Sequence, residues 1–169
     1  MKKRVLIFDT SVLCCWLAVP GKEEAGPKAD RWDQTRIQQK IADEQRRGST
    51  FVLPLASLIE TGNHIAQASG DRFSLATRFA KHLRDAADAT TPWAAFTDQS
   101  PLWEACQLKE LADRWPKLAA SGLSIGDATI ADVAEYYACA GYQVEILTGD
   151  QGLKAHEPAH PLQIPRRRK

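Results

Sequence analysis

The sequence has little net charge, no regular cysteine pattern and no long apolar run. Its 169 residues carry 22 Lys and Arg against 21 Asp and Glu, a formal net charge of +1. A chain so nearly neutral is not built to coat nucleic acid through bulk positive charge. Hydrophobic residues make up 44% and charged residues 25%, which is typical of a globular protein and excludes disordered, collagen-like and disulfide-scaffold chains. The length fits one domain with a sizeable core.

The small net charge hides an uneven distribution. Residues 166–169 are all basic, and removing these four charges from +1 leaves −3 for residues 1–165. We therefore expect one mildly acidic domain over 1–165, followed by a basic C-terminal tail over 166–169. The tail either adds nonspecific phosphate affinity or has no function.

Neither the cysteines nor the apolar N-terminal segment indicates export or a membrane. The apolar run that begins at residue 5 contains Asp9, Thr10 and Ser11 and is too short to span a bilayer. One adjacent cysteine pair and two single cysteines form neither a Cys-x-x-Cys metal motif nor a disulfide framework. We therefore expect buried free thiols in a reducing cytoplasm. The four cysteines are Cys14, Cys15, Cys106 and Cys139.

Short apolar runs alternate with capped or amphipathic segments, which predicts strands that alternate with helices around a parallel sheet in an α/β fold. Residues 5–8 have the continuous apolar pattern of a strand buried on both faces. The segment 21–48 is charged and is expected to contain a loop and a surface helix. Expected strands are 5–8, 50–53 and 142–147, with further candidates at 90–96 and 162–164. Expected helices are 11–19, 30–47, 57–69, 71–89, 100–114 and 124–140, with a turn and short helix at 149–156.

Four acidic residues occupy related places in this pattern. Asp9 and Asp150 follow two of the predicted strands, and Glu60 and Asp127 lie in the first turns of two predicted helices. Ligands of open α/β sheets bind beyond the carboxyl ends of the strands, and helices that follow strands begin at that edge. We therefore expect the four carboxylates to converge.

A cluster of carboxylates requires cations, because like charges at close range raise each other's pKa. Hard divalent cations that prefer oxygen ligands, Mg²⁺ or Mn²⁺, are the expected partners. Two such ions activate water and stabilise the leaving oxygen during phosphodiester hydrolysis. A metal-dependent hydrolase of phosphodiesters is therefore one interpretation of the four acids.

Helix capping is the other interpretation. Ser57-x-x-Glu60 and Ser124-x-x-Asp127 both match the capping-box pattern, in which the acid merely completes a helix N-terminus. Asp9 is able to cap the helix that follows it, and Asp150 to form a turn after Gly149. Capping alone does not explain why all four acids are expected at the same edge of the sheet.

Four segments resemble the motifs of PIN-domain nucleases, a family that includes the ribonuclease toxins of toxin–antitoxin pairs. They follow the family's order between residues 5 and 155, nearly the whole chain. The first acidic motif is Phe8-Asp9-Thr10-Ser11-Val12-Leu13, the second is Leu58-Ile59-Glu60, the third is Gly126-Asp127-Ala128-Thr129-Ile130-Ala131, and the last is Leu147-Thr148-Gly149-Asp150.

The resemblance implies a three-layer fold with a central, mainly parallel sheet flanked by helices, and a Mg²⁺- or Mn²⁺-dependent endoribonuclease that hydrolyses RNA. Asp9, Glu60, Asp127 and Asp150 would be its catalytic and metal-binding carboxylates. The hydroxyls that would orient them are those of Thr10, Ser11 and Thr148. As a toxin, the protein would be paired with a small antitoxin protein that masks the acidic groove, and the resemblance also implies a homodimer.

The chain departs from the family in two places. The segment 21–48 is longer and more charged than in the compact toxins. In addition, Asp150 is followed by Gln151-Gly152 and not by a further acid. Two other functions remain open. One is a phosphatase of the haloacid dehalogenase type with Asp9 as nucleophile, although Ser11 stands where that chemistry needs a second Asp. The other is a non-catalytic PIN-like binding module.

Several further residues have both a structural and a functional interpretation. Glu60 and His64, four residues apart on one predicted helix face, either share a metal or are unrelated. Trp32 and Trp93 are either packing residues or platforms for a base. Four basic residues of the predicted helix 71–89 form either a solvated face or a contact for the RNA backbone: Arg72, Arg78, Lys81 and Arg84.

Overall fold

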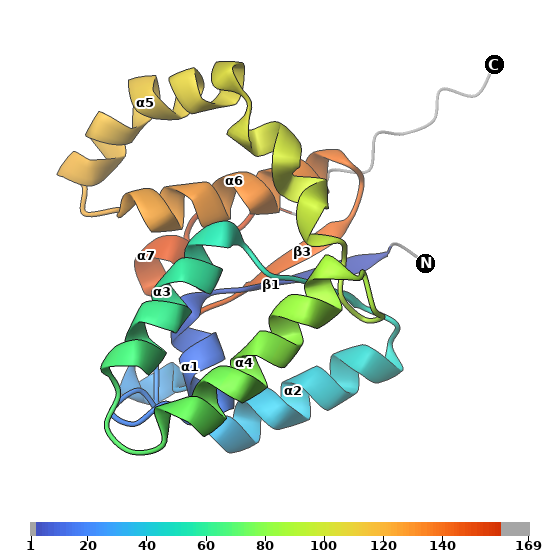
Figure 1. Ribbon diagram of the computed structural model, residues 1–169. Coiled ribbons are helices and arrows are strands. Elements are labelled where there is room, and N and C mark those ends of the chain that lie inside the picture. Colours follow the sequence, from blue (N-terminus) through green and yellow to red (C-terminus); the bar gives the residue numbers. More distant parts are fainter. Residues whose placement is uncertain (1–2, 160–169) are drawn as a thin grey trace.

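The computed structural model describes residues 3–159, in which helices surround a small parallel sheet (Figure 1). The strands are β1 (Arg4–Phe8), β2 (Thr50–Val52) and β3 (Gln143–Leu147). The α-helices are α1 (Thr10–Leu17), α2 (Gln34–Arg46), α3 (Leu55–Gln67), α4 (Arg72–Ala87), α5 (Ala105–Ala120), α6 (Ile125–Cys139) and α7 (Gln151–Lys154). Two 3₁₀ segments are η1 (Lys28–Asp30) and η2 (Phe96–Trp103).

The three strands are parallel and lie in the order β2-β1-β3, which confirms the predicted α/β fold. β1 is central: Val5 pairs with Thr50 on one side, and Phe8 pairs with Leu147 on the other. The chain leaves β1 first toward β2 and later returns past it to β3. The connections therefore run to opposite sides of β1, and such a switch point opens a ligand-binding crevice at the carboxyl ends of the strands.

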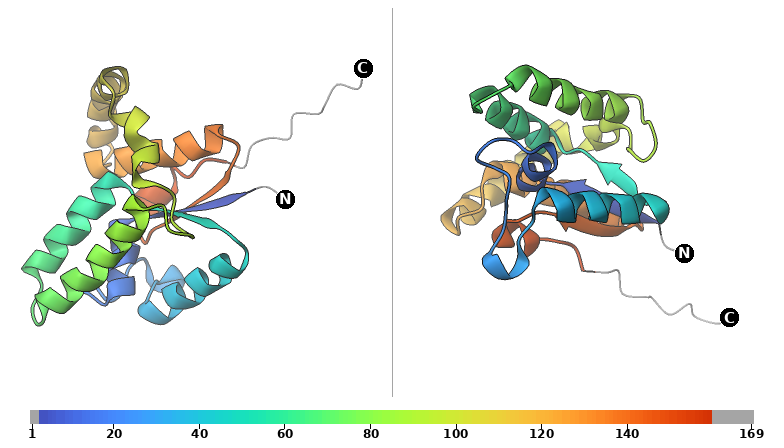
Figure 2. Two further views of the ribbon diagram at one scale, coloured as in Figure 1. Left: turned by 45° about the vertical axis from the view of Figure 1, so that its right-hand side comes forward. Right: turned by 90° about the horizontal axis from the view of Figure 1, so that it is seen from below.

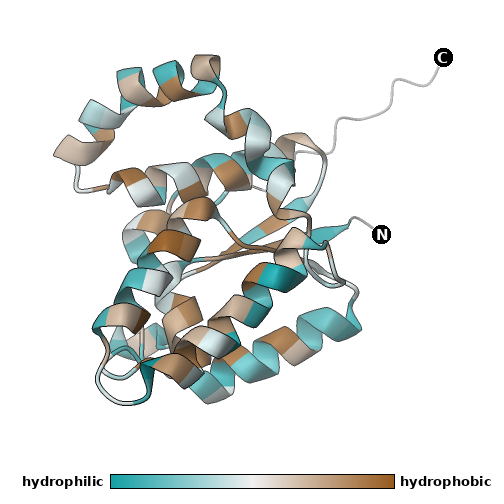
Figure 3. Ribbon diagram, in the orientation of Figure 1, coloured by the Kyte–Doolittle hydropathy of each residue, from teal (hydrophilic) through white to brown (hydrophobic). Residues whose placement is uncertain are grey.

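Helices cover both faces of the sheet because the side chains of β1 alternate between two apolar cores. Leu6 and Phe8 pack in a core with residues of α1, α2, α3 and α4, whereas Val5 and Ile7 pack with residues of α6 and α7. Figure 1 shows α6 on one side of the strands and α1, α2 and α4 on the other. Much of the strand ribbon is brown in Figure 3, as expected for a sheet covered on both faces.

Of the two further candidate strands, one is not formed and the other lies outside the described residues. Residues 90–96 do not form a strand: Trp93 makes only an isolated bridge with Phe51, beside Pro92, and η2 begins at Phe96. Proline has no N–H to donate to a ladder, so pairing stops after one bridge. The candidate at 162–164 and the basic tail at 166–169 lie outside the described residues.

The helix expected at 100–114 is displaced. Ser100 and Pro101 belong to η2, and α5 begins at Ala105 and continues to Ala120. η2 is held by the buried Gln99, whose Nε2 donates to the carbonyl of Leu53 at 2.7 Å. α5 packs against α6 and η2, and it lies on the outer side of α6 (Figure 2).

The expectation for the cysteines is half right. Cys14 and Cys15 are buried, but Cys106 and Cys139 are exposed, and all four are free thiols. Cys106 lies in the first turn of α5 and Cys139 at the C-terminal end of α6. Within residues 3–159, no helix is long and apolar enough to span a membrane.

The charged segment 21–48 divides into a loop and a helix. Residues 21–33, the 21–33 loop, close on themselves through a bridge between Ala25 and Trp32, and α2 follows. α2 is mostly hydrophilic in Figure 3 and packs on the core through Ile37 and Ile41. Trp32 and Trp93 are both buried, so they are packing residues and the base-stacking interpretation is wrong for them.

Candidate functional site

All four predicted acids line one cavity of about 360 Å³ at the carboxyl edge of the sheet. Asp9 is the N-cap of α1 directly after β1, and Asp150 is the N-cap of α7 shortly after β3. Asp127 lies in the first turn of α6. Glu60 lies in the second turn of α3, one turn later than predicted, because α3 begins at Leu55. The structure therefore brings together side chains from four separate elements.

Asp9 is the buried centre of the cavity, with 5% of its surface exposed. Its Oδ2 accepts hydrogen bonds from the hydroxyls of Ser11 at 2.6 Å and Thr148 at 2.7 Å. Within the part of the chain that the structure describes, no hydrogen bond reaches Oδ1. Oδ2 is thus occupied by hydrogen bonds within the protein, whereas Oδ1 remains able to accept a hydrogen bond or to bind a cation.

The Glu60 carboxylate lies close to α6 because residue 126 of that helix is glycine and has no side chain. Thr10 donates to Oε2 of Glu60 at 3.0 Å, which joins α1 to α3. A Cβ at Gly126 would lie 2.5 Å from Oε1 of Glu60. The glycine that precedes Asp127 therefore admits the neighbouring carboxylate, a function that sequence reasoning missed although Gly126 belongs to the third acidic motif.

Asp127 experiences the charge of the whole cluster. Burial raises the pKa of its carboxyl above the ordinary value, a hydrogen bond from Ser124 lowers it, and the negative charges of Asp9, Asp150 and Glu60 raise it further. The Ser124 hydroxyl donates to Oδ2 of Asp127 at 2.8 Å and accepts from its backbone N–H at 3.0 Å. The electrostatic environment therefore favours either a proton or a cation at Asp127.

The 21–33 loop and a chain of hydrogen bonds fix Asp150. Thr148 accepts from the backbone N–H of Asp150 at 2.9 Å, and Ser11 accepts from that of Gly149 at 3.0 Å. Trp32 Nε1 donates to the carbonyl of Thr148 at 3.1 Å. A Cβ at Gly149 would lie 2.6 Å from the backbone nitrogen of Gly26, so the loop packs directly on this turn. No signal in the sequence indicated that contact.

The capping interpretation is confirmed in part. The side chains of Asp9 and Asp150 accept backbone N–H groups at the starts of α1 and α7, and Ser124 caps α6. The proposed box between Ser57 and Glu60 is wrong, because Ser57 lies inside α3 and Pro54 precedes the helix. Capping therefore coexists with convergence on a cavity and does not replace it.

The oxygen-rich lining of the cavity fits a hard divalent cation. Mg²⁺ is commonly held by only one or two carboxylates, with water completing its coordination. Among residues 3–159, no group of three or more His, Cys, Asp or Glu side chains is already arranged to hold a metal ion. The four acids supply oxygen ligands of the type that such a cation takes. His64 also lines the cavity.

Three of the four basic side chains predicted to contact RNA have partners inside the protein. Arg72 donates to the carbonyl of Ala68 at 2.6 Å, and Arg78 donates to that of Leu17 at 2.9 Å. Lys81 pairs with Asp85 at 2.6 Å, one turn along α4. The guanidinium of Arg84 has no hydrogen bond or ion pair within the described residues. All four are exposed, so RNA contact stays a prediction for them.

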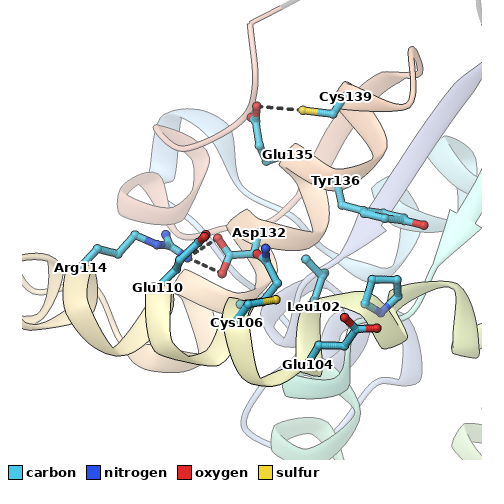
Figure 4. A pocket seen from close by; sticks show the side chains of 11 residues that line it. Leu102, Glu104, Cys106, Glu110, Arg114, Asp132, Glu135, Tyr136 and Cys139 are labelled. Carbon is cyan, nitrogen blue, oxygen red and sulfur yellow. Dashed lines mark hydrogen bonds and ion pairs between the residues drawn. The ribbon is translucent and has the colours of Figure 1, made fainter.

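A second cavity, of about 550 Å³, lies between α5 and α6 (Figure 4). Its walls carry an ion pair between Arg114 and Asp132 and the exposed thiols of Cys106 and Cys139. In Figure 4 the two cysteines extend from different helices and are not joined by a dashed line. None of the predicted acids lines this cavity.

Comparison with models of protein families, with curated proteins and with solved structures finds no match to this chain.

Proposed function

We propose that the protein is a metal-dependent endoribonuclease with a PIN-like fold. The convergence of Asp9, Glu60, Asp127 and Asp150 on one cavity carries this proposal. The strand order β2-β1-β3 places the cavity at the crevice where open parallel sheets bind ligands. Helix caps have no need of such a shared cavity, whereas cation-assisted phosphodiester hydrolysis does.

The carboxylates of Asp9, Glu60, Asp127 and Asp150 would hold Mg²⁺ or Mn²⁺. When bound, the cation supplies positive charge that offsets the repulsion among the acids and stabilises negative charge on the reacting phosphate. Ser11 and Thr148 orient the Asp9 carboxyl, because both donate to the same oxygen. Thr10 holds Glu60 against the start of α6.

We also propose that the protein is a toxin that acts in the cytoplasm, that a small antitoxin protein covers the cavity, and that the protein forms a homodimer. Exposed apolar side chains beside the acids support a covering partner: Ile59 precedes Glu60 and is 54% exposed, and Ile125 precedes Gly126 and is 50% exposed. Isolated apolar residues are common on surfaces, but these two adjoin the residues that line one cavity.

The decisive experiment measures cleavage of end-labelled single-stranded RNA by the purified protein with Mn²⁺, with Mg²⁺ and with EDTA. We expect divalent-dependent cleavage that Asp9→Asn and Asp127→Asn each reduce by roughly 10²-fold or more. Asp132→Asn is the matched control, because Asp132 lies on the same helix as Asp127 but lines the second cavity. Cleavage that is equal in all variants would come from a contaminant and would overturn the proposal.

A second readout is independent of activity. Mn²⁺ is expected to raise the melting temperature of the wild-type protein, because a ligand that binds only the folded state stabilises it. Asp9→Asn should weaken this shift, and Asp132→Asn should preserve it. Hydrolysis of an aryl phosphate in place of RNA would favour the phosphatase.

A further inference from the structure

The 21–33 loop brings a lysine to the wall of the acidic cavity. Lys22 lines this cavity together with Asp9, Glu60, Asp127 and Asp150. Burial and the neighbouring Cys15 raise the pKa of the Cys14 thiol to about 12, and the charge of Lys22 acts in the opposite direction. The ammonium group is therefore close enough to influence a residue in the cavity wall.

The backbone around Lys22 is well anchored. Its N–H donates to the carbonyl of Val19 at 2.9 Å at the end of α1. Further along the loop, Ala25 and Trp32 exchange two backbone hydrogen bonds, of 3.0 and 2.7 Å. Trp32 is in turn bonded to Thr148. The loop is thus attached to the same turn that positions Asp150, so the lysine and the acids belong to one framework.

The Lys22 side chain has no partner within residues 3–159, and it differs from the equally unpaired Lys28 in that it lines the cavity. Arg31 pairs with Glu24 at 2.6 Å, and Arg36 pairs with Asp30 at 2.7 Å. A cation without a fixed partner beside four carboxylates has either a structural or a ligand-binding function.

We infer that Lys22 binds the phosphate backbone of single-stranded RNA beside the phosphodiester that is cleaved. This inference rests on the proposed nuclease function and assigns the loop to substrate binding. An acidic cavity repels a polyanion until cations are present, and a lysine at its wall supplies a permanent point charge where the strand enters. Lysine is suited to this contact because its ammonium group binds phosphate without directional constraint.

The competing explanation makes Lys22 an internal counterion for the acids. These explanations predict different kinetics. A phosphate contact lowers KM for RNA and contributes to its salt dependence, whereas a counterion competes with the metal and leaves KM unchanged. Removing a counterion would therefore lower the Mn²⁺ concentration needed for half-maximal activity.

The test compares wild type with Lys22→Met, Lys22→Arg and Lys28→Met. Lys28 is a matched control, since it is exposed in the same loop but does not line the cavity. The values of kcat and KM are measured for a fluorogenic single-stranded RNA at saturating Mn²⁺ between 50 and 300 mM KCl. One phosphate contact contributes about 0.7 to the salt exponent and roughly fivefold in affinity at 0.1 M salt.

We expect Lys22→Met to raise KM about fivefold at 0.1 M KCl and to reduce the salt exponent by about 0.7, with kcat within about twofold of wild type. Lys22→Arg should restore most of the affinity, and Lys28→Met should match wild type. An unchanged KM and salt exponent in Lys22→Met would overturn the inference, as would an equal effect of Lys28→Met.

Binding of the same RNA is measured separately by fluorescence anisotropy in Ca²⁺. If wild type binds but does not cleave with any divalent cation, the nuclease proposal fails while weakened binding by Lys22→Met still supports the phosphate contact. If wild type cleaves and Lys22→Met binds RNA normally, the nuclease proposal survives and the inference fails. If wild type neither binds nor cleaves RNA, both fail.

Discussion

The hydroxyl of Thr148 donates a 2.7 Å hydrogen bond to Oδ2 of Asp9, joining residues that are 139 positions apart in the sequence. The bond links the end of β3 to the end of β1 beside the acidic cavity, which Asp9 lines. Because the same Thr148 oxygen accepts the N–H of Asp150, one hydroxyl orients two of the four acids.

We predict that Thr148→Val lowers the free energy of unfolding by about 1.5–3 kcal/mol, the usual contribution of a hydrogen bond to a charged group. RNA cleavage should fall as well, because both Asp9 and Asp150 lose an orienting contact. Thr148→Ser retains the hydroxyl and should remain near wild type. Urea unfolding and cleavage rates measure the two effects, and equal behaviour of the valine and serine variants would contradict them.

Gly126→Ala separates stability from activity. Alanine favours the helix by up to about 1 kcal/mol over glycine, but its Cβ would lie 2.5 Å from Oε1 of Glu60. The Glu60 carboxylate is the end of a flexible side chain and is able to move away. We therefore expect thermal stability to be maintained while divalent-dependent cleavage falls at least tenfold.

Gly62→Ala is the control for this prediction, since a Cβ at Gly62 would meet nothing within 4 Å. It should raise stability by a similar amount and leave cleavage unchanged. Full activity in Gly126→Ala would show that the position of Glu60 is unimportant.

Glu44 stabilises the fold at the opposite edge of the sheet. It is 0% exposed and interacts with Arg4, Lys40 and Ser49. We predict that Glu44→Gln destabilises the protein by about 1–3 kcal/mol, since the hydrogen bonds at this buried site lose their charge while Arg4 and Lys40 keep their ion pairs with Glu145. Asp43→Asn, which breaks only the more exposed pair with Arg46, should cost at most about 1 kcal/mol.

The stability that Glu44 provides depends on pH. Burial raises the pKa of Glu44, but hydrogen bonds from Ser49, Lys40 and Arg4 outweigh burial and lower the pKa overall. A lowered pKa in the folded state stabilises the protein. This stabilisation is complete above the unfolded-state pKa of about 4.3 and is lost as the pH falls below that value. Urea unfolding between pH 3 and 7 should therefore show a weaker acid dependence for Glu44→Gln than for wild type.

Arg78 and Arg84 test whether α4 binds RNA or only supports the fold. Arg78→Met removes the hydrogen bond to the carbonyl of Leu17 and should lower the free energy of unfolding by roughly 1–2 kcal/mol without changing KM for RNA. Arg84→Met should leave stability within about 0.5 kcal/mol of wild type. A raised KM in Arg84→Met alone would assign RNA contact to the unpaired arginine, and a raised KM in both would assign it to the helix face.

Local sequence patterns predicted the helices and strands whose formation depends on neighbouring residues. The apolar run at 5–8 indicated a strand buried on both faces, and β1 packs into both cores. Ser124 indicated the start of α6, and its hydroxyl forms the cap. Prediction was wrong at 100–114, where a buried side chain, Gln99, holds η2 and delays the next helix. That hydrogen bond to Leu53 spans 46 positions, so no local pattern encodes it.

The amino-acid sequence by itself determined the alternation of strands and helices and the position of an acid shortly after β1 and β3. Both follow from short-range rules of burial, capping and chain reversal. Only the tertiary structure decided that Glu60 reaches α6 through the space left at Gly126, and that the 21–33 loop brings Lys22 to the same cavity. These relationships depend on contacts between distant segments, because the cavity forms where four elements meet.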